Sequence, residues 1–343
     1  DTTTSYVYDD DGRLTQVNMP GSLTKSYSYN GTTGLLSQIT TPEGNHSLTY
    51  TTKDQLDTIS SPDSVTLNFD YDSELIDQKV QTSSNMVATI DNSHSEYLMT
   101  GSDLDINDTL NSQTLSSDIT YSYDDDRLLT SSGNLTITRD TNTAQITGTT
   151  LDDVTESFTY DSSFGELASY TAKFQSTTIY SEVYTRDYLG RITQKVVTQG
   201  GVTKTIDYVY DDTGRLYEVY ENSTLYHRYI YDNNSNRTGR VKLVGGVEVT
   251  ESATFDDQDR ILTFENTTYT HTNGGNRSSS VTSGGDTFNT TYETMGALKT
   301  LTHIHSGGTD NYTFKNDSSG NRIEVVKNST TQTRYVYNSK NQV

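Results

Sequence analysis

Apolar and polar residues alternate along the chain in short runs, and turn-forming residues separate the runs. Alternation places every second side chain on one face, which is typical of a half-buried β-strand. The segment 6–17, YVYDDDGRLTQV, shows the unit: two tyrosines, an Asp-rich turn with a glycine, then aliphatic residues. No segment keeps a helical period over three turns. The pattern predicts an all-β chain of consecutive hairpins with strands of about six residues.

This unit repeats along the chain. Tyr8, Tyr29, Tyr50 and Tyr71 stand 21 residues apart. Because a single hairpin is marginally stable in water, the units are expected to stack. Further copies lie at 121–132, 158–170, 184–196, 208–220 and 229–241, with weaker ones at 253–264, 290–301, 312–326 and 335–343.

The consensus Tyr-x-Tyr-Asp-x-x-Gly-Arg-Leu has a physical explanation. Tyr6 and Tyr8 share one face of a strand. Asp9 then occupies the first position of a type I turn and Gly12 the fourth, where a positive φ is tolerated, and Leu14 begins the return strand. The residues assigned to the consensus are Tyr6, Tyr8, Asp9, Gly12, Arg13, Tyr29, Tyr50, Tyr71, Tyr123, Asp124, Tyr160, Asp161, Asp187, Gly190, Arg191, Tyr208, Tyr210, Asp211, Gly214, Arg215, Tyr229, Tyr231, Asp232, Tyr335 and Tyr337.

The stretch 81–119 departs from the repeat. Only the segment 88–91 looks like a degenerate copy, with Ile90 in place of the tyrosine. We expect this stretch to continue the sheet with longer loops. Gly-Gly pairs elsewhere recur as turn signals and do not mark a linker. The sequence therefore predicts that residues 1–343 form a single continuous array.

The composition indicates an ordered, strand-rich and acidic chain. Only 30% of residues are hydrophobic, but 26 tyrosines and eight phenylalanines supply large side chains that disordered chains lack. A formal net charge of -22 makes nucleic acid and anionic membrane surfaces poor partners. No apolar run is long enough to cross a bilayer, and residues 1–4 lack the features of a secretory signal. The absence of cysteine excludes disulfides and thiolate chemistry.

The sequences YDDDGRLT, YDDTGRLY, YDNNSNRT and ITYSYDDDRLLTSSGNLTITRD resemble the YD-repeat (RHS-repeat) family. That family includes RHS toxins, the cocoon-forming components of ABC-type toxin complexes, and teneurin shells. The resemblance covers nearly the whole chain. It implies a β-solenoid, a spiralling sheet of stacked hairpins that wraps into a hollow tube or shell.

The sequence also departs from that family. RHS toxins end the shell with an Asp-Pro-containing core motif followed by a toxin domain, and this sequence has no Asp-Pro pair. Segments 2–17 and 330–343 begin at the same phase of the repeat. We therefore expect both termini to be open sheet edges, which need a partner strand.

The sequence contains only incomplete motifs for catalytic or cofactor sites. The run from Asp232 to Asn236 begins like an EF-hand loop, but Arg237 and Leu243 occupy its glycine and glutamate positions. Asp103, Asp105 and Asn107 fail in the same way at Asp108 and Thr114. Turn capping is the favoured interpretation of the acidic clusters, with opportunistic calcium as the alternative. Since Gly-x-Ser-x-Gly and Walker sequences are absent, and carboxylate pairs arise by chance among 46 acidic residues, we predict no enzyme and no cofactor.

The six histidines are scattered. His303 and His305 share one face of an expected strand and could chelate a metal ion. A solvent-facing pair is the commoner arrangement, so the sequence predicts no metal site.

Arginines and tyrosines of the repeat are assigned structural roles. Arg13, Arg191 and Arg215, with Arg127 and Arg260 in similar places, are predicted to pair with an aspartate of the neighbouring repeat. Tyrosine ladders are predicted to fill the spaces between stacked strands; a sugar-stacking surface is the alternative. One such ladder is predicted to consist of Tyr208, Tyr210, Tyr229 and Tyr231.

Asn-x-Ser/Thr sequons exceed the number expected by chance and favour a glycosylated extracellular protein, if the host has N-glycosylation machinery. The candidate acceptors are Asn30, Asn45, Asn107, Asn134, Asn222, Asn233, Asn236, Asn266, Asn276, Asn289, Asn311, Asn316 and Asn328.

These features together predict a non-catalytic extracellular or cell-surface scaffold. It would be a segment of a long shell, or a unit that joins further copies of itself end to end through open edges. Two alternatives stay open. One is a stretch of a cocoon that encloses a toxin, and the other is an adhesin that binds glycans.

Overall fold

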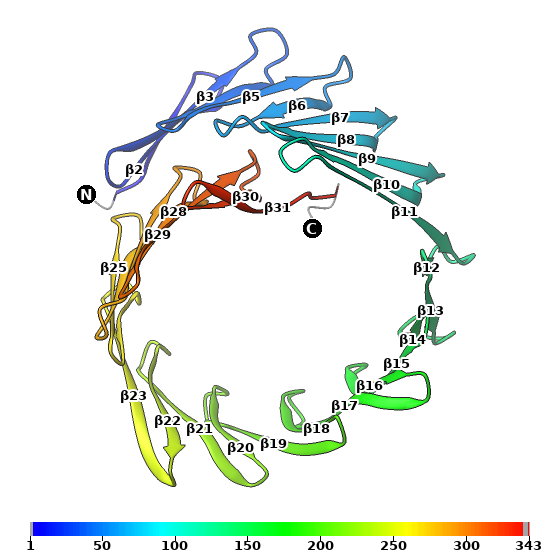
Figure 1. Ribbon diagram of the computed structural model, residues 1–343, viewed down its shortest axis with the longest axis vertical. Helices are drawn as coiled ribbons and strands as arrows, with labels where there is room; N and C mark the ends of the chain where they lie inside the picture. Colours follow the sequence, from blue (N-terminus) through cyan, green and yellow to red (C-terminus); the bar gives the residue numbers. More distant parts are fainter. Residues whose placement is uncertain (1–2, 339–341, 343) are drawn as a thin grey trace. The chain divides into compact units, whose positions relative to one another are not determined.

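The computed structural model describes residues 3–338 and 342, and within them every regular element is a β-strand (Figure 1). The predicted all-β class is confirmed. The strands form one antiparallel sheet in which chain neighbours pair. They are β1 Ser5–Tyr8, β2 Leu14–Met19, β3 Leu23–Tyr29, β4 Leu36–Thr41, β5 Gly44–Tyr50, β6 Leu56–Ser60, β7 Thr66–Asp72, β8 Leu75–Ser83, β9 Met86–Ser95, β10 Leu98–Asp108, β11 Gln113–Tyr123, β12 Leu129–Ser132, β13 Leu135–Arg139, β14 Ile146–Leu151, β15 Val154–Tyr160, β16 Leu167–Phe174, β17 Thr177–Arg186, β18 Ile192–Gln199, β19 Val202–Tyr210, β20 Leu216–Glu221, β21 Thr224–Tyr231, β22 Arg237–Val244, β23 Val247–Phe255, β24 Ile261–Phe264, β25 Thr267–His271, β26 Arg277–Thr282, β27 Thr287–Tyr292, β28 Leu298–His305, β29 Gly308–Asn316, β30 Arg322–Lys327 and β31 Thr330–Arg334.

Contacts divide the chain into two compact units. Unit 1 comprises Asp1–Asp118 and Asn266–Val343, and unit 2 comprises Ile119–Glu265. Each unit is a series of hairpins. Whether residues 1–343 behave as one continuous array stays a prediction.

Each YD turn follows a shift in strand pairing. In the first hairpin Val7 pairs with Gln16 but Tyr8 pairs with Leu14, so the return strand carries one extra residue. The same shift occurs at Tyr29, and it recurs along unit 2. A β-bulge of this kind bends the strand and increases its twist. The local sequence therefore builds a curved hairpin end into each copy.

The stretch 81–119 continues the sheet, as expected, but the prediction of longer loops is wrong. β9 and β10 have 10 and 11 residues and are joined by the two-residue turn 96–97. Apolar residues keep the two-residue period through β9, which is why the strand continues without a break. Ile90 lies in mid-strand opposite Leu104 and is buried. It therefore does not occupy the strand-end position of a repeat tyrosine.

The core of unit 1 combines apolar and polar residues from both of its chain segments. Leu67, Ile90 and Ile323 are buried together with Gln81 and Lys79. The C-terminal strands run beside the N-terminal ones (Figure 1), and the Gln81 amide donates to the Tyr335 carbonyl at 3.0 Å. Lys79 Nζ donates to the Tyr337 carbonyl at 2.9 Å. Polar side chains thus connect segments that lie more than 250 residues apart in sequence.

Unit 2 buries a charged residue as well as small apolar ones. Glu251 is 2% exposed and pairs with both Arg240 and Lys242. Hydrogen bonds from Lys242 and Arg240 lower the pKa of Glu251 to about 2, although burial opposes them. The Arg240 and Lys242 side chains are 30% and 36% exposed, so solvent screens part of their attraction to Glu251. The pairing links β22 to β23.

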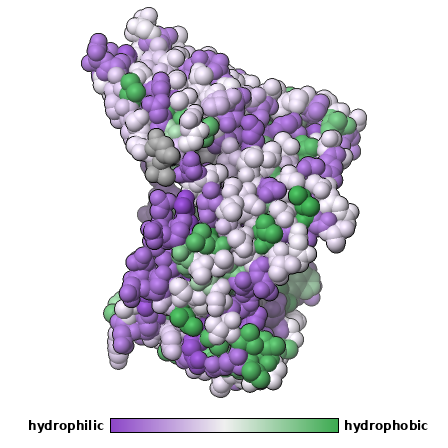
Figure 2. All heavy atoms as spheres, turned by 90° about the vertical axis from the view of Figure 1, so that its left-hand side faces the viewer, coloured by the Kyte–Doolittle hydropathy of each residue, from purple (hydrophilic) through white to green (hydrophobic). Residues whose placement is uncertain are grey.

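One face of the molecule is mainly hydrophilic (Figure 2). Figure 2 shows hydrophilic and intermediate residues over most of the face in view, with hydrophobic residues in separated groups. Among the described residues, no helix is long and apolar enough to span a membrane.

Candidate functional site

The YD turn is organised by its aspartate. Asp9 Oδ1 accepts the backbone N–H groups of Asp11 at 3.1 Å and Arg13 at 2.8 Å. The N–H of Gly12 donates to the Asp9 carbonyl, and Gly12 adopts a φ of 77°. The left-handed conformation costs a residue with a Cβ about 1–2 kcal/mol, which explains the glycine. The predicted turn, with a glycine of positive φ at its fourth position, is confirmed here.

The arginine that follows the turn pairs with the aspartate of its own turn. Arg13 Nε donates to Asp9 Oδ2 at 2.8 Å. The predicted arginine–aspartate ladder holds only in part, because the carboxylate partner lies in the same turn whereas Arg215 also donates to the backbone carbonyl of Asp232 in the next repeat. Arg127 differs again, since it occupies the glycine position with a φ of 64°. The same pairing within the turn is made by Arg191 with Asp187, Arg215 with Asp211, and Arg260 with Asp256.

In six copies the second tyrosine connects neighbouring repeats. Paired residues of β2 and β3 run from Gln16–Ser26 to Met19–Leu23, so the ladder does not reach Leu14 at the start of β2. Beyond that point the Tyr29 hydroxyl donates to the Leu14 carbonyl at 2.8 Å. The tyrosine thus satisfies a carbonyl that the strand ladder no longer reaches. Equivalent bonds run from Tyr71 to Leu56, Tyr160 to Ile146, Tyr210 to Ile192, Tyr231 to Leu216, and Tyr337 to Arg322. We call this bond the inter-repeat lock.

Other residues replace the tyrosine in the lock. Arg186 Nη2 donates to the Leu167 carbonyl at 3.2 Å, and Asn316 Nδ2 donates to the Leu298 carbonyl at 3.2 Å. Sequence reasoning missed these residues, although each immediately precedes the turn aspartate, as in YTRD and FKND. What the position requires is a side-chain donor long enough to reach the previous repeat. Arg139 and Asn92 make the same kind of contact with Leu129 and Ile76.

The arginine also contacts the lock of the next repeat. The Arg215 guanidinium lies 4.6 Å from the ring centroid of Tyr231, and its Nη1 donates to the Asp232 carbonyl at 3.2 Å. Arg191 stacks on Tyr210 at 4.5 Å in the same way. Cation–π contacts contribute about 0.5–1 kcal/mol at exposed sites. Aspartate, arginine and tyrosine therefore form a chain of contacts from one repeat to the next.

The electrostatics keep the turn aspartate ionised and the tyrosine protonated. Desolvation raises the pKa of Asp211, but hydrogen bonds from Thr213 and Arg215 outweigh it and hold that pKa well below its usual range. Burial raises the pKa of Tyr231 above that of a free tyrosine. The lock therefore persists across the neutral range.

The tyrosines at the start of the chain differ in environment. Tyr6 and Tyr8 are each 58% exposed on β1, which pairs with β2 on one side in the described part of the chain. Other assigned tyrosines, such as Tyr50 and Tyr208, lie half-buried in the ends of β5 and β19. The packing interpretation of the tyrosine ladder thus agrees with the bonded hydroxyls of Tyr210 and Tyr231.

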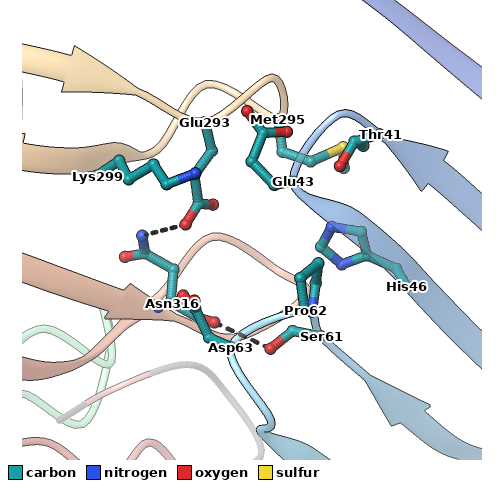
Figure 3. Close-up of a pocket in the computed structure, with 10 residues that line it drawn as sticks. All are labelled: Thr41, Glu43, His46, Ser61, Pro62, Asp63, Glu293, Met295, Lys299 and Asn316. Atoms are coloured by element: carbon teal, nitrogen blue, oxygen red, sulfur yellow. Dashed lines mark hydrogen bonds between the residues drawn. The ribbon is translucent and has the colours of Figure 1, made fainter.

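A small cavity of about 60 Å³ lies between the two chain segments of unit 1 (Figure 3). Glu43 Oε1 accepts the N–H and the hydroxyl of Thr294 at 3.2 and 3.1 Å. Asp63 Oδ2 accepts the N–H of Asn316 at 3.0 Å, and Asn316 Nδ2 donates to Glu293 Oε1 at 3.1 Å. The cavity is a junction whose hydrogen bonds join residues near 43–63 to residues near 293–316.

The pKa values of Glu43 and Glu293 in this cavity shift in opposite directions. Burial raises the pKa of Glu293, and the nearby charges of Asp63 and Glu43 add to the rise. For Glu43, desolvation is outweighed by hydrogen bonds, Thr294 foremost, which lower its pKa. Burial lowers the pKa of His46, whose Nδ1 lies 3.1 Å from the Ser318 hydroxyl.

One cluster of metal-ligating side chains occurs within residues 3–338. His303, His305 and Asp310 place one ligand atom each within 4.8 Å of one another. Sequence analysis paired the two histidines but missed Asp310, because its proximity depends on the register of β28 with β29.

Other candidate sites are placed as follows. Asp232 caps its turn by accepting the N–H groups of Asn234 and Asn236. Asp103 and Asp105, in contrast, lie within β10 and do not cap a turn, so the turn-capping prediction is wrong for them. The sequon residue Asn316 is 3% exposed and bound to Glu293, so it is not a glycan acceptor in the folded chain. The other candidate acceptors are exposed, except for the half-buried Asn236.

Comparison with known proteins identifies the family. A family model described as Teneurin YD-shell matches residues 1–103 and 34–343. The chain belongs to the teneurin YD-shell family. No curated protein matches the sequence. Within this family match no enzyme family is evident, and the resemblance inferred from the sequence is confirmed.

One solved structure supports the fold assignment. The chain is similar to the crystal structure of TcdB2-TccC3-TEV, with 12% identity and a TM-score of 0.61, over 94% of this chain and 21% of that chain. It also matches the Photorhabdus luminescens Tc holotoxin pore, with 11% identity and a TM-score of 0.46, over 94% of this chain and 24% of that one. The chain therefore spans about a fifth of the length of the first structure.

Proposed function

We propose that the chain is a non-catalytic structural segment of a YD-repeat shell at the cell surface or outside the cell. The inter-repeat lock carries this proposal. The same bond recurs in both units, from Tyr29 in unit 1 to Tyr231 in unit 2. Each lock ties one hairpin to the previous one, so the repeats that carry it resist separation. Such an arrangement serves mechanical strength and requires no reacting groups.

The partner we propose is a further copy of the chain, or flanking repeats, joined by strand addition. Within residues 3–338, β1 pairs with β2 on one side, and Tyr6, Val7 and Tyr8 on this edge strand are exposed. An edge strand offers unpaired backbone groups that a second strand can bind.

Sedimentation velocity tests this partner. We expect the wild-type chain to associate with rising concentration, and Val7→Lys to weaken association because a charged residue disfavours edge pairing. Val209→Lys is the matched control, since Val209 is similarly exposed at 41% but its strand pairs on both sides. A chain that stays monomeric at every concentration contradicts the proposal.

A second candidate function is a stretch of a shell that encloses a polypeptide cargo. The likeness to TcdB2-TccC3-TEV over 94% of this chain favours it. A coding sequence that continues past Val343 into an Asp-Pro core motif and a distinct domain would support this function, and one without them would oppose it.

A third candidate is a glycan-binding adhesin. The turn residues Phe164 and Tyr188 are 66% and 99% exposed, and exposed aromatic rings can stack on sugars. A glycan array is the direct measurement. Binding that is lost in Tyr188→Ala would favour this function, and an array without signal would exclude it.

A further inference from the structure

We propose that the β28–β29 hairpin carries a binding site for a divalent first-row transition metal, formed by His303, His305 and Asp310. His303 and His305 lie two residues apart on β28 and share one face of the sheet. Asp310 on β29 pairs directly opposite His303. All three ligands thus belong to one hairpin, and its register alone brings them together. The proposal departs from the sequence prediction of no metal site.

The spacing of the ligand atoms suits a tetrahedral ion. His305 Nε2 lies 3.6 Å from Asp310 Oδ2, and the three ligand atoms lie within 4.8 Å of one another. Zinc–ligand bonds of about 2.0–2.1 Å in tetrahedral geometry place neighbouring ligand atoms about 3.3 Å apart. Small side-chain rotations therefore close the site. Because all three residues are half-buried, water can supply the fourth ligand.

His303 is held ready for a metal ion. Its ring stacks on Phe288, with centroids 4.1 Å apart and an angle of 8° between the planes. Its Nε2 is buried and has no hydrogen-bond partner. A buried polar atom without a partner costs free energy, and a metal ion would satisfy this nitrogen. The stacking fixes the ring, so little side-chain entropy is lost on binding.

The metal must displace existing contacts of the other two ligands. Lys327 Nζ lies 2.9 Å from Asp310 Oδ2, and Asn328 Nδ2 donates to Oδ1 at 2.9 Å. The metal takes the place of the Lys327 ammonium, while Asn328 continues to orient the carboxylate. The Gly307 N–H donates to His305 Nδ1 at 3.1 Å, and this bond is given up when His305 coordinates through Nε2. Binding therefore competes with Lys327.

The ligand set selects the class of metal. Two imidazoles and one carboxylate suit Zn²⁺, and also Co²⁺, Ni²⁺ and Cu²⁺. Ca²⁺ and Mg²⁺ prefer sets of oxygen ligands and are disfavoured.

Isothermal titration of the untagged full chain with Zn²⁺ tests the site. We expect His303→Phe, which keeps the stacking on Phe288, and Asp310→Asn to weaken Zn²⁺ binding at least about tenfold. His271→Gln is the control, since His271 lies outside the cluster and its replacement leaves the affinity unchanged. Lys327→Met removes the competing ammonium and is expected to strengthen binding.

The variants are expected to change the Zn²⁺ affinity in opposite directions, and this keeps the test decisive. A misfolded variant loses affinity but does not gain it, so stronger binding by Lys327→Met supports the site independently. Co²⁺ absorption bands of a tetrahedral complex, lost in Asp310→Asn, support it further. Affinities within about twofold of wild type in both His303→Phe and Asp310→Asn overturn the proposal. Unchanged or weaker binding by Lys327→Met also counts against it.

Discussion

At the scale of single residues, each polar residue of the repeat consensus has a specific partner in its own turn or in a neighbouring repeat. The aspartate holds its own turn, the arginine bridges that turn to the next repeat, and the tyrosine hydroxyl reaches back to the previous one. Arginine or asparagine can replace tyrosine because the carbonyl needs only a donor. The polar end of the tyrosine therefore matters as much as its ring.

Removal of one lock hydroxyl should lower stability locally. We expect Tyr231→Phe to reduce the free energy of unfolding by about 1 kcal/mol, because the Leu216 carbonyl loses its donor while the ring stays in place. Tyr188→Phe, on a residue that is 99% exposed, is the matched control and should change nothing. Chemical denaturation measures both. Equal effects of the two variants would show that the hydroxyl bond adds no stability.

A second tyrosine should respond to alkaline pH. The hydrogen bond to Glu156 raises the pKa of Tyr170 to about 12, with burial adding to the rise. Since the folded-state pKa exceeds the unfolded value near 10, this group stabilises the fold below pH 10 and loses that contribution as the pH rises towards 12. Tyr170→Phe should therefore flatten the fall in melting temperature between pH 10 and 12. An unchanged slope in that variant would contradict the assignment.

At the scale of the hairpin, backbone conformation decides which turn residues are favourable. Gly12 has a φ of 77°, whereas Asp54 occupies the corresponding position of its own turn with a φ of 63°. Both turns close with an N–H donated to the carbonyl three residues earlier. Glycine is thus favoured but not essential.

Substitutions at these two positions should change the stability of the fold in opposite directions. Gly12→Ala places a Cβ in the left-handed region and should cost about 1 kcal/mol, although no atom lies within 4 Å of the new Cβ. Asp54→Gly relieves the same strain and should raise the melting temperature slightly. Thermal unfolding by circular dichroism measures both. A loss of stability in Asp54→Gly would show that its side chain does more than occupy the turn.

The sequence predicted the local elements but not the contacts that depend on register. Alternation and the Asp-Gly turns predicted strands and hairpins, because both act over a few residues. The acceptor of Tyr29 could not be predicted, since it depends on the β2–β3 ladder ending at Gln16. Asp310 reaches His303 only through the β28–β29 register. The prediction of longer loops in 81–119 was wrong, because short turns such as 96–97 let the strands extend.

At the scale of the whole molecule, the two units are stabilised differently. Unit 2 is a run of consecutive hairpins, whereas unit 1 also joins segments more than 250 residues apart through contacts such as Glu43 with Thr294 and Lys79 with Tyr337. These long-range bonds are formed by charged and polar groups, so the stability of unit 1 should depend on pH.

Two variants in the same cavity should therefore shift the stability of unit 1 in opposite directions. Glu43→Gln should lower it by about 1 kcal/mol at pH 7, because the charged acceptor of Thr294 is lost. Glu293→Gln should raise it, because it removes a buried charge near Asp63 yet keeps an oxygen for Asn316. Calorimetric melting temperatures at several pH values measure both.

The signs follow from the two pKa shifts. The lowered pKa of Glu43 makes its contribution present above pH 4.5 and lost as the pH falls further. The raised pKa of Glu293 makes its penalty appear as the pH rises above the same value. Both variants should thus approach the wild type in acid. Asp10→Asn, in an exposed turn, controls for the change in net charge. Shifts that persist unchanged at acid pH would mean that packing, and not charge, holds the two segments of unit 1 together.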